Sequence, residues 1–383
     1  MPAPIRVLYL TTRGLRSSSS QPLWLCVRRF SADGFRCQVA LREEPDSERT
    51  RGRVASMGVE LHRVQMSRSR LWPFGGRRAT LRRLARIVRD QRIDLVHAFQ
   101  AKAAPFAVAL TRATGVRHVV QLRGAYPRRS LYARLLLHRA NVVLAPSESL
   151  LRLYEEMVGR AARPGQRRAI LPPAIDVEGF RKLKGSLDVR SELGMAPGQP
   201  LVGLLGPLSP ASNHRLALEV ARRVHAERPE ARFLFLGRPA GAGALERFSA
   251  DRARMGLRDV CMVAGPRPSS APYAAAMDLL LHTSAREAHP GCFNKAMAFA
   301  KPIVASRVPG QQEAVEHGAT GLLCSPGDAV EMATAVSSLL DSPDLRRLMG
   351  GAGKRRVQRL YSSDRSLPIL ETLYREVARP GAS

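Results

Sequence analysis

The stretch that decides the fold runs from Thr283 to Gly310 and reads TSAREAHPGCFNKAMAFAKPIVASRVPG. Its first part is polar and passes through Pro290-Gly291 into a helical run. Apolar residues recur there at i, i+3, i+4 and i+7, which predicts a helix with one apolar face: Phe293, Ala296, Met297 and Ala300. Lys301-Pro302 ends that helix, and the apolar residues that follow start a short buried strand.

The loop before this helix carries Glu287 and His289. A loop that leads into a helix presents free backbone N–H groups and the positive end of the helix dipole to whatever lies in front. This arrangement suits an anion such as a diphosphate. The alternative is an ordinary loop before a buried helix, and this stretch by itself leaves both interpretations open.

The alternation of short strands and helices extends through the whole chain. Strands are predicted at 5–10, 37–41, 59–64, 94–98, 118–122, 141–145, 201–205, 232–236, 260–264, 279–282, 303–305 and 321–323. Helical runs are predicted at 22–30, 101–114, 150–157, 215–226, 343–360 and 364–378, among others. Paired prolines within 170–176 mark a hinge. The pattern predicts an α/β protein with two doubly wound domains, 1–174 and 175–360.

Length and composition agree with a two-domain protein. The chain has 383 residues and is 45% hydrophobic, which is enough for two cores. It has no apolar run of eighteen residues and no signal-peptide pattern at its start, so we expect neither a membrane span nor secretion. The five cysteines show no Cys-x-x-Cys spacing and are expected to be reduced, mostly buried thiols of a cytoplasmic protein.

The net charge of +29 is concentrated in the first half of the chain. Residues 1–175 contain 33 Lys and Arg against 11 Asp and Glu, a net charge of +22, which leaves +7 for the rest. Such a field attracts polyanions, which include nucleic acid, an anionic lipid surface and a charged substrate. Charge alone does not select among these partners.

Residues 67–92 form a distinct basic segment. Seven arginines follow Trp72 and Phe74, and Leu81, Leu84, Ile87 and Val88 form an apolar stripe between them. A basic amphipathic helix beside aromatic residues fits contact with an anionic membrane surface. The alternative is a surface helix whose leucine stripe packs on its own sheet while the arginines are solvated.

Several common catalytic motifs are absent from the sequence. It has no Asp-x-Asp pair, no zinc-type cluster and no Gly-x-Ser-x-Gly elbow, so we expect no bound metal. Residues 350–354, GGAGK, resemble a phosphate loop, but Leu348 and Arg355 occupy the positions where that loop needs Gly and Ser or Thr. Ligands of doubly wound folds lie outside the carboxyl ends of the strands, which for two domains means the cleft between them.

The ordered motifs of the chain resemble the large retaining glycosyltransferase family with the GT-B fold. The segments that carry the resemblance are 5–14, 94–98, 172–180, Glu287 to Ala298, 301–306, Gly310-x-x-Glu313 and 318–323. This family includes many lipopolysaccharide, capsule and phosphoinositol mannosyltransferases. The resemblance implies two Rossmann-like domains facing across a cleft, with residues 361–383 crossing back to pack on the first domain.

The implied activity is transfer of a hexose from a nucleoside diphosphate sugar to a glycan or lipid-linked acceptor, with retention and without a metal or cofactor. The base, UDP or GDP, is left undetermined. By resemblance, Glu287 and Arg123 are catalytic, and Glu287 binds the hydroxyls of the donor sugar. The other predicted donor-binding residues are Gly14, Gly206, Asn213, Arg267, His289, Pro290, Gly291, Cys292, Phe293, Asn294, Lys295 and Glu313.

The chain departs from the family pattern where the donor phosphates bind. Lys295 replaces a second glutamate that binds the ribose, Pro207 and Ser212 replace phosphate-binding Arg and Lys, and Arg123 replaces a histidine. Each lost charge-assisted contact is worth ~1.5–3 kcal/mol. Either Lys295, Arg267, Arg238 or Arg286 supplies the missing charge to an active enzyme, or the protein is a degenerate member that acts as a partner or regulator. A nucleic-acid-binding protein is a third possibility, disfavoured because no recognised binding module is present.

Overall fold

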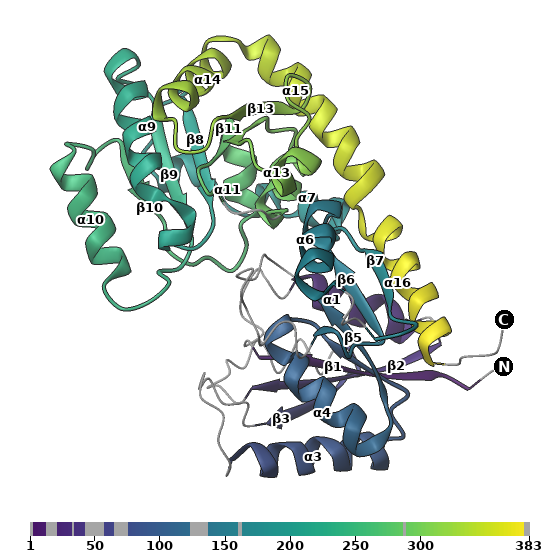
Figure 1. The fold of residues 1–383 in the computed structure, drawn as a ribbon. Helices are drawn as coiled ribbons and strands as arrows, with labels where there is room; N and C mark the ends of the chain where they lie inside the picture. Colours follow the sequence, from purple (N-terminus) through teal and green to yellow (C-terminus); the bar gives the residue numbers. More distant parts are fainter. Residues whose placement is uncertain are drawn as a thin grey trace. The chain divides into compact units, whose positions relative to one another are not determined.

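The computed structural model describes residues 3–12, 21–32, 34–42, 57–64, 76–122, 137–159, 163–285 and 289–378. The chain divides into two compact units (Figure 1). Unit 1 comprises Met1–Ala174 and Ser363–Ser383, and unit 2 comprises Ile175–Ser362. Among the described residues, no helix is both long and apolar enough to span a bilayer.

Unit 1 contains a seven-stranded parallel sheet of order β3-β2-β1-β4-β5-β6-β7. Its strands are β1 (Ile5–Thr11), β2 (Phe35–Arg42), β3 (Glu60–Val64), β4 (Leu95–Ala98), β5 (Arg117–Gln121), β6 (Val142–Ala145) and β7 (Arg167–Ile170). Its helices are α1 (Gln21–Ala32), α3 (Gly76–Asp90), α4 (Ala104–Thr114), α6 (Glu148–Val158) and α16 (Ser363–Ala378). The central strands β1, β4 and β6 are short and almost wholly buried because helices cover both faces of the sheet.

Alternate strand residues supply the two layers of the unit 1 core. Leu8 and Leu10 pack with α3, α4 and α6 on one face, while Val7 and Tyr9 pack with α1 and α16 on the other. The leucine stripe of α3 therefore packs on its own sheet, and Leu84 is fully buried there. Figure 1 shows α3 and α4 adjacent on one side of this sheet.

The C-terminal helix α16 is bound to the centre of this sheet by a buried polar group. The Tyr374 hydroxyl lies 2.5 Å from Nδ1 of His97 on β4 and donates to the Tyr9 hydroxyl, 3.3 Å away. Burial lowers the pKa of His97 to about 3, so the ring is neutral. The predicted packing of the C-terminal helix on the first domain is confirmed.

Unit 2 contains a six-stranded parallel sheet of order β10-β9-β8-β11-β12-β13. Its strands are β8 (Leu201–Leu205), β9 (Arg232–Leu236), β10 (Cys261–Val263), β11 (Leu279–His282), β12 (Ile303–Ser306) and β13 (Gly321–Cys324). Its helices are α7 (Val177–Lys182), α8 (Val189–Glu192), α9 (His214–Glu227), α10 (Ala244–Arg254), α11 (Ala271–Ala276), α12 (Gly291–Ala298), α13 (Pro309–Ala314), α14 (Ala329–Asp341) and α15 (Pro343–Arg356). A π-helical turn, Val357–Tyr361, follows α15.

Two apolar layers again enclose the sheet of unit 2. Helices α9, α10 and α14 cover one face, and α7, α11 and α12 cover the other. Phe293, Ala296 and Met297 of α12 are fully buried, as the helical spacing of the sequence predicts. The two doubly wound parallel sheets confirm the predicted fold class.

Strand β7 and helix α10 are among the elements that were not predicted from the sequence. The edge strand β7 ends where the predicted hinge, 170–176, begins, and its first two residues, Arg167 and Arg168, are exposed. An edge strand with charged, solvent-facing residues lacks the apolar alternation on which a prediction depends. Helix α10 was also missed, because its mean hydropathy is low and only Ala244 and Phe248 are buried.

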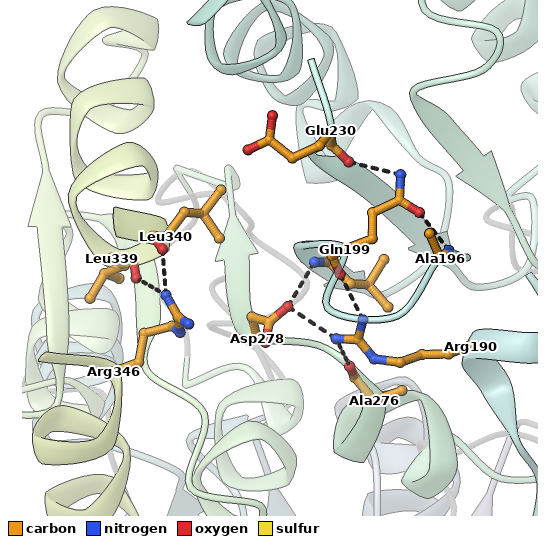
Figure 2. A network of polar contacts seen from close by, with 10 residues as sticks. Arg190, Ala196, Gln199, Glu230, Ala276, Asp278, Leu339, Leu340 and Arg346 are labelled. Atoms are coloured by element: carbon orange, nitrogen blue, oxygen red, sulfur yellow. Dashed lines mark hydrogen bonds and ion pairs between the residues drawn. The ribbon is translucent and has the colours of Figure 1, made fainter. Parts of the chain in front are cut away.

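The beginnings of the two central strands of unit 2 are held by one arginine (Figure 2). Arg190 on α8 donates to the carbonyls of Gln199 and Ala276, at 2.6 and 2.9 Å, and to Oδ2 of Asp278 at 3.1 Å. The same carboxylate oxygen accepts from the backbone N–H of Leu201, 2.8 Å away. These contacts fix β8 and β11 relative to each other, and the candidate site lies at their opposite ends.

Candidate functional site

The candidate site lies where the strand order of unit 2 reverses. β8 and β11 are neighbours in the sheet, but the chain leaves β8 toward β9 on one side and continues from β11 toward β12 on the other. The crevice outside the carboxyl ends of two such strands is the usual ligand site of this architecture. The loop after β8 begins with Gly206, and the loop after β11 begins with Thr283.

A hydrogen bond joins these two loops. The Thr283 hydroxyl lies 2.8 Å from the carbonyl oxygen of Ser212 and 3.2 Å from that of Asn213. The Ser212 hydroxyl donates to the carbonyl of Pro207, 2.8 Å away, so the loop after β8 is also tied to itself. Thr283 is 2% exposed, and its contact fixes the start of α9 against the end of β11.

Two helices begin at this crevice, and neither has a side-chain cap. The N-cap of α9 is Asn213, held in the left-handed region at φ 50°, and the N-cap of α12 is Pro290. Neither residue makes a capping hydrogen bond through its side chain, and neither helix has an acidic residue in its first turn. Uncapped first-turn N–H groups and the positive dipole ends favour an anion, at ~0.3–1 kcal/mol for each helix and up to ~2 kcal/mol when partly buried.

The side chains under the crevice are neutral. Burial lowers the pKa of His282 to about 4, with a smaller effect from His214, and burial lowers the pKa of His214 to about 4 as well. Burial raises the pKa of Cys292 to about 12, against the opposing effect of Lys295. The Cys292 sulfur lies 3.9 Å from Nδ1 of His282. An anion bound above these groups therefore meets no negative charge from them.

His289 and Asn294, both predicted to bind the donor, contact each other. Nε2 of His289 lies 2.9 Å from Oδ1 of Asn294, and the imidazole packs edge-on against Tyr361, with ring centroids 4.6 Å apart. Burial lowers the pKa of His289 to about 4, so the neutral ring donates from Nε2. The carbonyl of Glu313 accepts from Arg356 at 2.8 Å and from Tyr361 at 3.2 Å. These contacts fix α12 and α13 to the end of α15.

Lys295 lies in the second turn of α12 and contacts two other elements. Its ammonium donates to Oγ of Ser270, 3.1 Å away, and stands 5.9 Å from the centroid of the Phe180 ring. Burial lowers the pKa of Lys295, which the neighbouring Cys292 partly opposes. Within the described ranges no carboxylate pairs with this ammonium. Lys295 is therefore a partly buried cation with neutral neighbours.

The other cations proposed for the site differ in how available they are. Arg267 donates to Oε1 of Glu192 at 2.5 Å, so its charge is already paired; the Tyr273 hydroxyl donates to Oε2 of the same carboxylate at 2.8 Å. Arg238 is exposed beyond the end of β9. Arg286 lies outside the described residues, as do Gly14, Arg123 and Glu287.

The structure thus brings Gly206, Asn213, Gly291 and Cys292 to the ends of β8 and β11. It also adds three residues that sequence reasoning did not select: His214, His282 and Thr283. The sequence could have indicated these residues only by their positions, because each lies at or directly after the end of a strand or at the start of a helix.

Comparison with known proteins gives two family matches. Residues 199–342 match the family model described as Glycosyl transferases group 1, and residues 23–172 match that of the Glycosyl transferase 4-like domain. The chain is similar to the D-inositol 3-phosphate glycosyltransferase of Segniliparus rotundus, with 29% identity over 225 residues, 58% of this chain and 49% of the relative. The enzyme of that name from Nocardia farcinica is 29% identical over 273 residues, 69% of this chain and 57% of the relative. The chain spans about half the length of these curated relatives.

Solved structures share the fold over nearly the whole chain. HepE of Anabaena, crystallised with UDP and glucose, superposes with a TM-score of 0.81 at 18% identity, covering 96% of this chain and 99% of HepE. Sucrose-phosphate synthase of Thermosynechococcus elongatus gives 0.76 at 18% identity, covering 97% and 99%. At this identity the likeness concerns the fold.

Proposed function

Because the chain belongs to the Glycosyl transferases group 1 family, we propose that it transfers a hexose from a nucleoside diphosphate sugar to a glycan or lipid-linked acceptor. Transfer proceeds with retention of the anomeric configuration and without a metal. The observation that carries the proposal is the pair of uncapped helix starts, α9 and α12, at the reversal of strand order in unit 2.

The chemical demand of this reaction is stabilisation of the departing diphosphate, where negative charge develops in the transition state. Backbone N–H groups at the starts of α9 and α12 meet this demand with donors that are already oriented. The neutral histidines and the protonated Cys292 beneath them add no repulsion. By the family resemblance, Glu287 is assigned to the sugar hydroxyls and Arg123 to a catalytic role; both lie outside the described residues.

The two helix starts do not fully replace the energy of the two missing phosphate contacts. Pro207 and Ser212 stand where two phosphate-binding cations are expected, a loss of ~3–6 kcal/mol at ~1.5–3 kcal/mol per contact. The two helix starts together stabilise a bound anion by ~1–4 kcal/mol. Lys295 lies on α12 itself, is largely buried, and has no carboxylate partner in the described part of unit 2. We assign the remaining stabilisation to Lys295, directed at an anionic group of the donor.

A degenerate, non-catalytic role is the second candidate, favoured by one observation. Arg267 is already paired with Glu192, so it does not replace a lost phosphate contact without breaking that pair. A protein that kept the fold and lost turnover would still act as a binding partner or regulator.

The test combines donor binding with turnover. Calorimetry with UDP, GDP and their hexose conjugates measures binding, and an assay of donor consumption with a glycan, a lipid-linked and an inositol phosphate acceptor measures transfer. The enzyme proposal predicts that one nucleotide sugar binds and is consumed, and that Glu287→Ala abolishes consumption. Binding of a nucleotide sugar without its consumption in the presence of any acceptor would favour the degenerate role. Absence of any nucleotide binding would eliminate the enzyme proposal.

Helix α3 supports a peripheral contact with an anionic membrane surface. Arg82, Arg86 and Arg89 are exposed, while the apolar side of the helix is buried in its own unit. The attraction is therefore electrostatic, at ~1 kcal/mol for each basic residue near the surface. Trp72 and Phe74, the aromatic part of the predicted contact, lie outside the described residues. Such a contact would bring a lipid-linked acceptor close to the enzyme.

A further inference from the structure

Unit 1 contains a cavity of about 410 Å³ at the amino ends of its strands. It is bounded by the last turn of α4, the start of β5, and the segments that lead into β6 and β7. The expected ligand crevice of a doubly wound sheet lies at the carboxyl ends of the strands. The cavity is therefore on the opposite edge of this sheet and belongs to neither the donor site nor its first-domain counterpart.

Three arginines from three different segments line the cavity: Arg112, Arg139 and Arg163. None of them forms an ion pair with a carboxylate in the part of the chain that the structure describes. Nε of Arg139 donates a hydrogen bond to Nε2 of His138, 3.3 Å away. All three side chains are exposed, and three like charges around one cavity favour an anionic ligand over a neutral one.

A buried histidine lies in the same wall. His118 is 1% exposed, and its Nδ1 is 2.8 Å from the Thr111 hydroxyl. Its Nε2 has no hydrogen-bond partner within the described residues. A buried polar atom without a partner is uncommon in folded proteins, and this one belongs to a residue that lines the cavity. Burial, and to a smaller extent Arg163, lowers the pKa of His118 to about 4.

Backbone hydrogen bonds connect the segments that frame the cavity. The backbone N–H of Arg163 donates to the carbonyl of His138 at 2.9 Å, and that of Asn141 donates to the carbonyl of His118 at 3.2 Å. Oδ1 of Asn141 accepts in turn from the backbone N–H of His118, 2.9 Å away. The arginines are thus carried on segments whose backbones are already fixed, as a preformed ligand site requires.

We propose that this cavity binds a phosphate monoester. Its dianionic group matches the positive charge of the arginines, and the planar guanidinium fork is suited to phosphate oxygens. Val108 and Pro164 form apolar parts of the wall, which accommodate the carbon skeleton that a monoester has and inorganic phosphate lacks. The volume lies within the range of small-molecule sites, ~300–1,000 Å³. The phosphate is carried by a soluble metabolite or by a lipid with a phosphomonoester head group.

The test measures binding of glycerol 3-phosphate to the full chain by calorimetry, with inorganic phosphate and glycerol as reference ligands. A parallel arm measures cosedimentation with vesicles containing phosphatidic acid, against phosphatidylcholine vesicles. We expect glycerol 3-phosphate or the phosphatidic acid vesicles to bind, and Arg112→Ala, Arg139→Ala and Arg163→Ala each to weaken that binding about tenfold. Arg163→Lys keeps the charge without the fork and should give an intermediate loss.

The matched control is Arg258→Ala, which removes an exposed arginine from unit 2 and the same unit of net charge. Thermal unfolding of every variant establishes that it is folded, which exposed arginines should allow. The proposal is overturned if neither probe binds, if inorganic phosphate and glycerol 3-phosphate bind with equal affinity to all variants, or if Arg258→Ala weakens binding as much as the cavity variants. If the cavity variants lose binding only to the phosphatidic acid vesicles, the monoester is a lipid head group. If they lose binding to glycerol 3-phosphate, it is a soluble metabolite.

Discussion

The Thr283 hydroxyl donates a hydrogen bond to the carbonyl of Ser212, 2.8 Å away, and so ties the end of β11 to the loop that starts α9. These two residues are far apart in the sequence but adjacent at the point where the strand order reverses. Because α9 begins directly after this loop, the bond sets the direction in which its first N–H groups point.

Thr283→Val should weaken nucleotide binding and the fold by similar amounts. Loss of one largely buried hydrogen bond costs ~1 kcal/mol of unfolding free energy, while a misdirected helix start lowers affinity about three- to tenfold. Calorimetry with UDP and GDP and urea unfolding measure the two effects. Thr372→Val is the control, because that hydroxyl bonds only to a carbonyl of its own exposed helix face at 3.1 Å. Equal losses of affinity in both variants would refute the role of Thr283.

Lys295→Met should stabilise the ligand-free protein and impair its binding of donor. Burial disfavours the charged form of Lys295 and lowers its pKa, so a neutral side chain of similar length removes a destabilising charge. The same change removes the cation assigned to the donor. Thermal unfolding without ligand and calorimetry with nucleotide sugars test the two halves. Lys182→Met, at an exposed position of α7, should change neither quantity, and unchanged donor affinity in Lys295→Met would exclude the assignment.

Unfolding free energy should fall as the pH drops from about 6.5 toward 4. His214, His282 and His289 have pKa values of about 4 in the folded protein against about 6.5 unfolded, so the unfolded state binds more protons in this window. Each contributes up to ~2 kcal/mol between pH 7 and 5. Urea unfolding at pH 7, 6 and 5 should show a smaller loss for His289→Gln, which keeps a donor toward Asn294. If the unfolding free energy of His289→Gln fell with pH as steeply as that of the parent chain, the prediction would be wrong.

Gly237→Ala should destabilise unit 2 and disturb the loop after β8. A Cβ at Gly237 would lie 1.7 Å from the carbonyl oxygen of Gly206, which is backbone and moves only with its strand. Overpacking of this kind costs ~1–3 kcal/mol and displaces the chain that leads to Pro207 and Asn213. Urea unfolding and UDP calorimetry measure both effects. Gly185→Ala is the matched control, because a Cβ there meets no atom within 4 Å.

Replacing Arg82, Arg86 and Arg89 together by Gln should release the protein from anionic membranes. At ~1 kcal/mol for each basic residue, the triple change weakens binding about a hundredfold. Cosedimentation with phosphatidylserine vesicles at low salt gives the readout, and added salt should release the parent protein in the same way. Three exposed arginines of unit 2, Arg258, Arg355 and Arg359, provide the charge-matched control. No sedimentation of the parent protein would remove the membrane contact from the proposal.

Much of the fold was predictable because its signals are local. The period-2 and period-3.6 patterns placed the central strands, and the spacing of Phe293, Ala296 and Met297 placed α12 with its buried face. The predicted C-terminal helical run at 364–378 corresponds to α16, Ser363–Ala378. Strand β7 was not predictable in this way, because an exposed edge strand of arginines carries no apolar alternation.

The candidate site was predictable only in part. Gly206, Asn213 and Gly291 could be assigned from their places at strand ends and helix starts. Sequence reasoning also offered Arg267 as a free cation, whereas Glu192, 75 residues earlier, already holds it. His282 and Thr283 escaped notice because nothing in their local pattern separates them from ordinary residues at the end of a strand.

The sequence by itself determined that this protein has two parallel α/β units with an uncapped helix after a polar loop, since strand and helix periods depend on near neighbours along the chain. Only the tertiary structure decided which loops contact each other and which groups each cation contacts. Thr283 reaches Ser212 across 71 residues, and Lys295 reaches Ser270 across 25. The order of strands in the sheet selects these partners, and strand order is a property of long-range packing that no local period encodes.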